Sequence, residues 1–126
     1  MTTAAALRAR YVGDAVATAS PARLLVMLYD RLVLDLLQAE RAQREKNRET
    51  ANTSLQHAQR IVVELQFSLD VTAWDGGPGL SRLYTYLLSE LTAANVRCDA
   101  DRTARCRALV EPLQEAWREA ATQVAS

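Results

Sequence analysis

The residues with the greatest potential for chemistry are one histidine and two cysteines. His57 is the only histidine among the 126 residues, and Cys98 and Cys106 are the only thiols. A structural zinc site needs four such ligands. A ferritin-like di-metal bundle needs paired Glu-x-x-His motifs, but the residue three positions before His57 is a serine. We therefore expect no metal, no cofactor, a solvated His57 and two reduced, partly buried thiols.

Two further segments resemble functional motifs only in composition. The glycine-rich run at residues 76–79 follows an expected helix rather than a strand, so it predicts a connection and not a phosphate-binding loop. A basic cluster is interrupted by Asp99 and Asp101, which favours a solvated helix end. Its members are Arg97, Arg102, Arg105 and Arg107. We accordingly expect a protein that is not an enzyme.

Apolar side chains on otherwise polar helix faces are the remaining candidates for function. They are Met27, Leu34, Val63, Phe67, Tyr86 and Leu88. Single exposed apolar residues are ordinary, but helically spaced pairs such as Val63 with Phe67 are typical of a partner-binding surface. Such anchors suit a groove that receives an amphipathic helix.

Chain breakers divide the sequence into four helical blocks that must position these residues. The blocks cover about residues 21–46, 49–69, 80–97 and 100–122. Ser20 and Pro21 form a helix start, and Asp99 can cap the last block. Pro112 predicts a kink in one helix, with two shorter helices as the alternative. Short connections favour an all-α, antiparallel up-down four-helix bundle over residues 18–126, preceded by an N-terminal arm over residues 1–17.

Each block carries one apolar stripe that the bundle would bury. In the first block the expected stripe is Leu25, Leu28, Leu32, Val33, Leu36 and Leu37. In the last block it is Cys106, Leu109, Val110, Leu113, Trp117 and Ala120.

Charge and hydropathy exclude several classes of partner. Fifteen basic residues balance fifteen acidic ones, which disfavours nucleic acid and a polybasic membrane anchor. No apolar run reaches the ~20 residues of a membrane span. The N-terminus lacks the basic start of a signal peptide. We expect a cytoplasmic protein.

An ordered set of motifs resembles the flagellar secretion chaperone family (FliS type). Tyr11 and Val16 precede Ser20-Pro21, which leads into Met27-Leu28-Tyr29-Asp30. The later motifs, in order, are residues 58–65 with Ser68-Leu69-Asp70, then Leu83-Tyr84-x-Tyr86, Leu91-x-x-Ala94-Asn95, and Leu113-x-x-x-Trp117. Pro112 and the loop around Trp74 depart from the family pattern.

The resemblance implies a chaperone that binds the C-terminal segment of flagellin. It would prevent premature polymerisation and keep flagellin competent for type III secretion, with the flagellar export apparatus as a further partner. The resemblance also adds Tyr11 and Val16 to the partner-binding residues. A monomer or weak dimer is expected. The alternatives are a homo-oligomeric regulatory or structural bundle, and a metal-dependent helical enzyme.

Deletion of residues 1–17 should change the kinetics of flagellin binding. An arm tethered beside an open groove has a high local concentration there and competes with the ligand. Stopped-flow measurements should show faster peptide association, or faster release if the arm also clamps the bound chain, together with increased self-association. Rates and a monomer profile equal to those of the full-length protein would identify a passive tail.

Overall fold

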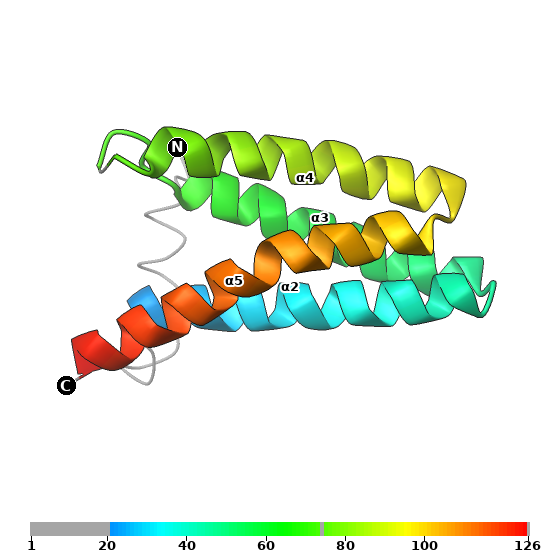
Figure 1. Cartoon of the computed structure of the whole chain (residues 1–126), viewed down its shortest axis with the longest axis horizontal. Coiled ribbons are helices and arrows are strands. Elements are labelled where there is room, and N and C mark those ends of the chain that lie inside the picture. The colour runs from blue at the N-terminus through cyan, green and yellow to red at the C-terminus, as the bar shows by residue number, and fades with distance from the viewer. Residues whose placement is uncertain (1–20, 74, 126) are drawn as a thin grey trace.

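The computed structural model describes residues 21–73 and 75–125, which form four helices and no strand (Figure 1). The helices are α2 (Pro21–Arg44), α3 (Arg48–Ser68), α4 (Gly77–Arg97) and α5 (Ala100–Ala125). Both α2 and α4 pack against α3 and α5. This confirms the all-α four-helix bundle. The expected arm at residues 1–17, with Tyr11 and Val16, lies outside the described residues, as do Ser20 and Trp74.

Local hydrogen bonds explain where the helices begin and end. The side chain of Asn47 accepts from Thr50 N at 3.2 Å and caps α3. Cys98 ends α4 in the left-handed region at φ 50°, and Asp99 Oδ1 then accepts from Arg102 N at 3.0 Å. This contact confirms the predicted Asp99 cap. The third helix begins at Gly77 rather than near Leu80, because Pro78 is tolerated in a first turn.

The core is built around two buried tyrosines from α2 and α4. The hydroxyls of Tyr29 and Tyr84 lie 2.5 Å apart, and the Trp117 ring of α5 packs 6.4 Å from the Tyr29 ring. Burial raises the pKa of both phenols, so both remain protonated and one can donate to the other. Buried leucines of α2, α3 and α4 belong to the same cluster. The last helix, α5, contributes Cys106 and Val110, and its Leu113 and Trp117 pack against the cluster.

A second buried contact joins three helices near the opposite end of the bundle. Gln43 of α2 donates to Ala94 O of α4 at 3.0 Å and accepts from Thr103 Oγ1 of α5 at 2.7 Å. Both side chains are essentially inaccessible. Because buried polar groups are costly when unpaired, this bridge fixes the relative height of the three helices.

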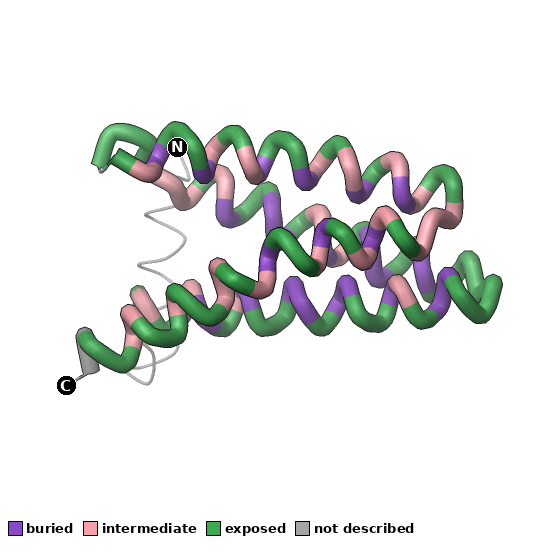
Figure 2. The backbone as a smooth tube through the Cα atoms, viewed as in Figure 1, coloured by how far each residue is buried: buried purple, intermediate pink, exposed green. Residues whose placement is uncertain are grey.

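The last helix is continuous through Pro112, which excludes the alternative of two shorter helices. In Figure 1, α5 leaves α4 after their connecting turn and runs toward the start of α2. Beyond Val110, no residue of α5 with a described side chain is fully buried (Figure 2). The bundle is therefore closed at the 98–100 turn and less tightly packed along the second half of α5.

Candidate partner-binding surfaces

The first surface lies along the contact between α3 and α4 and consists of Val63, Phe67 and Leu88. Hydrogen bonds from Gln59 to Thr92 (3.4 Å) and from Gln66 to Thr85 (3.0 Å) set the antiparallel register of the two helices. That register places Val63 opposite Leu88. We call this set the α3–α4 surface.

Exposure differs among the three residues of the α3–α4 surface. Phe67 is 74% exposed and Val63 is 36% exposed. Leu88 is half-buried and packs against the core. The prediction from residue spacing, which placed Leu88 off the core, is therefore wrong in part. Leu88 is therefore the less exposed part of this surface, and Val63 and Phe67 are its more exposed part. Apolar burial on this surface would contribute about 25 cal/mol per Å² removed from water.

The second surface is the outer face of α2. Met27 and Leu34 are 50% and 42% exposed, as their spacing predicts. Leu37, expected in the core, is also exposed at 45%. The physical reason is that the buried residues of α2, Tyr29 among them, cover a narrower arc than its apolar residues span.

The third surface lies between α4 and α5 and consists of Leu83, Tyr86, Leu109 and Leu113. Tyr86 is 52% exposed and donates to Glu90 Oε1 at 3.2 Å. Leu109, which the sequence assigns to the core, is 42% exposed. Leu83 and Leu113 are half-buried against the core. We call this set the α4–α5 surface.

The described candidates therefore do not form one site. Val63, Phe67 and Leu88 come together, whereas Met27 and Leu34 lie on another helix and Tyr86 lies on the α5 side of α4. The remaining candidates, Tyr11 and Val16, lie outside the described residues. A single short helix could cover one of these surfaces, and a partner that reaches all of them must wrap around the bundle.

His57 is not the solvated side chain that the sequence predicts. Its Nδ1 contacts the carboxylate of Asp35, which is only 1% exposed, and Arg31 Nε reaches the other carboxylate oxygen at 3.1 Å. A buried carboxylate is stable only when it is paired. The contact joins α3 to α2. The available sequence signal was Arg31, four residues before Asp35.

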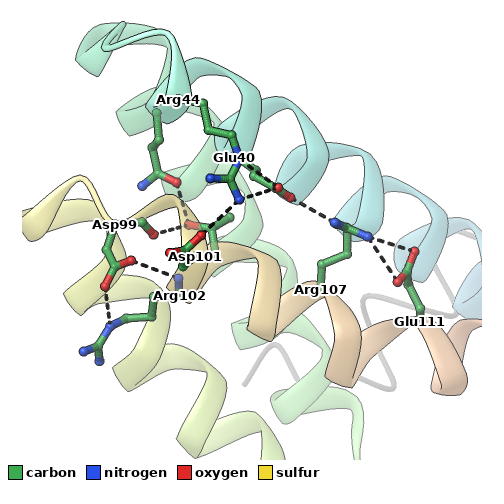
Figure 3. A network of polar contacts seen from close by, with 9 residues as sticks. Glu40, Arg44, Asp99, Asp101, Arg102, Arg107 and Glu111 are labelled. Atoms are coloured by element: carbon green, nitrogen blue, oxygen red, sulfur yellow. Dashed lines mark hydrogen bonds and ion pairs between the residues drawn. The ribbon is translucent and has the colours of Figure 1, made fainter.

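The basic cluster is also more than a solvated helix end, because two of its arginines hold helices together. Figure 3 shows one of them, Arg107. Arg107 of α5 reaches Glu40 of α2 at 3.0 Å, and Arg102 reaches Glu90 of α4 at 2.7 Å. Glu40 also pairs with Arg44 at 2.9 Å. Arg97 and Arg105 remain exposed, as predicted.

Acidification should weaken the ion pairs of Glu40. Partial burial opposes its charge, but hydrogen bonds from Arg107 and Arg44 prevail and lower the pKa of Glu40 below its usual 4.5. A lowered folded-state pKa gives a stabilisation that is present above the unfolded-state value and is lost as the pH falls through the folded-state value. Chemical denaturation at a series of pH values from neutral downward should therefore show that the free energy of unfolding falls less below about pH 4.5 in Glu40→Gln than in the wild type.

The control for this measurement is Glu45→Gln, which removes an ion pair with Arg41 whose two members are both exposed. Such surface pairs contribute little to stability, so its pH profile should stay close to that of the wild type. A Glu40→Gln profile identical to the wild-type profile would contradict the assigned role of Glu40.

Neither thiol is part of a reactive constellation among the described residues. Cys98 and Cys106 are both free, and burial raises the pKa of Cys106 to about 11. In the described part of the chain, no three His, Cys, Asp or Glu side chains are grouped so that they could bind a metal ion.

Comparison of the whole sequence with known proteins identifies the family of this chain. The family model described as "Flagellar protein FliS" matches residues 3–124. This chain belongs to the FliS family. The match covers α2, α3, α4 and α5 up to residue 124, together with the N-terminal residues Tyr11 and Val16.

Two curated FliS relatives are similar over most of their length. The flagellar secretion chaperone FliS of Escherichia coli (strain K12) is 32% identical over 110 residues, which cover 86% of this chain and 81% of the relative. The flagellar secretion chaperone FliS of Bacillus subtilis (strain 168) is 29% identical over 110 residues, covering 87% and 82%. These matches confirm the resemblance drawn from the motifs. Among the described residues of this FliS-family chain, no helix has the length and apolar character required to cross a bilayer.

Proposed function

We propose that this FliS-family protein is a cytoplasmic chaperone, without catalysis or cofactor, that binds the C-terminal segment of flagellin. Binding would prevent premature polymerisation and keep flagellin competent for flagellar type III secretion. The observation that carries the proposal is Phe67, an aromatic residue that is 74% exposed and lies one helical turn from the exposed Val63. An exposed aromatic anchor of this kind is typical of a surface that receives an amphipathic helix.

The distribution of exposed apolar residues supports a partner that wraps the bundle. The α3–α4 surface and the outer face of α2 lie on different sides of the bundle, whereas a short globular contact would need one contiguous patch. A segment that orders on binding loses about 2–5 kcal/mol or more of the interaction energy to ordering. A long path over several apolar anchors supplies the area that offsets this cost, at roughly 1.5–3 kcal/mol for a fully buried Phe or Leu.

A calorimetric titration with a synthetic peptide of the flagellin C-terminal segment tests the proposal. We expect saturable one-to-one binding with a gain in helical circular dichroism, and no binding of a scrambled peptide. In the cell, the flagellar export apparatus would recognise the complex of the chaperone with flagellin. Absence of binding would overturn the proposal.

The second candidate function is a homo-oligomeric regulatory or structural bundle, in which the exposed apolar residues of one copy meet those of another. Light scattering coupled to size exclusion, with and without the flagellin peptide, separates the two. A monomer or weak dimer that binds peptide supports the chaperone. A stable oligomer that ignores the peptide supports the alternative.

A further inference from the structure

The contact between α4 and α5 has features that the flagellin proposal does not use. Arg102 of α5 pairs with Glu90 of α4, with 2.7 Å between Nη1 and Oε2. This ion pair holds the two helices together near their connecting turn. Farther from that turn α5 diverges from α4, and its described side chains beyond Val110 are not fully buried (Figures 1 and 2). The α4–α5 surface lies on this less tightly packed part.

The apolar residues of the α4–α5 surface form two facing rows. On α4, Leu83 and Tyr86 are three residues apart, and on α5, Leu109 and Leu113 are four apart, so each pair lies on one helix face. Leu83 and Leu109 each lie seven residues from the Glu90–Arg102 ion pair, on the side away from the connecting turn. Each helix thus contributes one half-buried leucine and one more exposed side chain to this surface, and we call these four residues the track.

Basic side chains border this track. Arg82 lies one turn before Tyr86, and Arg105 lies one turn before Leu109. Both are exposed, and neither makes an ion pair with any described residue. The charge of Arg105 also acts on the Tyr86 hydroxyl, which places it beside the track. Arg102 already pairs with Glu90 and with Asp99, on which the charge of Arg105 also acts.

We propose that the α4–α5 surface docks an amphipathic helix with acidic flanks, contributed by a protein partner other than the flagellin C-terminal segment. Leucines of the partner helix would cover Leu83, Tyr86, Leu109 and Leu113, while its Glu or Asp side chains would pair with Arg82 and Arg105. Charge complementarity of this kind selects the partner and fixes its register.

A second copy of this chain fits the track less well. A two-fold interface brings the same surface of both copies together. It would therefore place the arginines of one copy near those of the other, and juxtaposed like charges are strongly unfavourable. The track also lies on the α5 side of α4, across that helix from the α3–α4 surface, so both surfaces can be occupied at once.

The test uses two synthetic amphipathic peptides of about four helical turns with the same leucine spacing at i, i+3, i+4 and i+7. One carries Glu on both flanks, and the matched peptide carries Lys. We expect fluorescence anisotropy to show saturable binding of the Glu peptide and binding of the Lys peptide that is weaker by about tenfold or more. Equal binding of the two peptides, or none, would overturn the inference.

Variants locate the site. Leu109→Ser and Arg105→Glu should each weaken the Glu peptide about tenfold or more. Leu37→Ser removes a leucine of nearly the same exposure (45% against 42%) from the outer face of α2 and should leave binding unchanged. Thermal unfolding of each variant verifies that the bundle persists. An equal loss of affinity for the Glu peptide in Leu37→Ser and Leu109→Ser would show that the peptide binds without a defined site, and this would overturn the inference.

Saturation with the flagellin C-terminal peptide separates this inference from the proposed function. The Glu peptide should still bind with unchanged affinity. Its displacement would assign the track to flagellin and refute a separate partner. If the flagellin peptide fails to bind while the Glu peptide binds, the proposed function fails and the inference stands.

Discussion

Leu87→Ala should lower the free energy of unfolding by about 2–5 kcal/mol, the cost of a large-to-small change in a close-packed core. Leu87 lies mid-way along α4, is 1% exposed and belongs to the cluster that includes Tyr29 and Tyr84. The side chains around it are held by four helices, so the cavity can collapse only in part. Urea denaturation followed by circular dichroism measures the change.

The matched control is Leu37→Ala, which truncates an exposed leucine and should stay within ~0.5 kcal/mol of the wild type. If Leu87→Ala were as stable as this control, the register of α4 in the bundle would be wrong.

Phe67→Ala should weaken binding of the flagellin C-terminal peptide by at least about tenfold, or 1.4 kcal/mol, while leaving thermal stability nearly unchanged. The phenyl ring is 74% exposed, so its removal costs the free protein little. In the proposed complex, the same ring is an apolar anchor, and its loss would remove buried area that nothing else replaces. Calorimetric titration and thermal unfolding of the same preparation give both numbers.

Val96→Ala is the control, because Val96 is also 74% exposed but lies near the end of α4, away from the α3–α4 surface. Its peptide affinity should equal that of the wild type. Equal weakening in both variants would remove Phe67 from the site. A loss of several kcal/mol in the stability of Phe67→Ala would assign the ring to the core instead.

Two leucines at the edges of the predicted apolar stripes show where a prediction of burial from a single helix fails. Leu37 and Leu109 fit the stripes of their helices, yet both are more than 40% exposed. A stripe is defined on one cylinder, whereas burial depends on how far the neighbouring helices reach around it. The divergence of α5 from α4 leaves Leu109 uncovered, and no periodicity within residues 100–125 encodes that divergence.

His57 and the arginines show the same limit for polar residues. On its own helix His57 lies on a polar flank, and only the packing of α3 on α2 brings it to Asp35. Likewise, in the sequence Arg107 is one member of a charged run. Only the packing of α5 on α2 places its guanidinium 3.0 Å from the carboxylate of Glu40. Pair partners 22 and 67 residues apart leave no local pattern.

The sequence alone determined the four helices and their order, the Asp99 cap, the bundle and the family, because these follow from local propensity, helical apolar spacing and motifs in series. It also determined that Met27, Leu34, Val63, Phe67 and Tyr86 lie off the core, since a residue opposite a buried stripe faces solvent. The tertiary structure alone decided which of these residues meet, which leucines at the stripe edges stay uncovered and which charges pair. Those outcomes depend on the separation and crossing of helices that are distant in sequence.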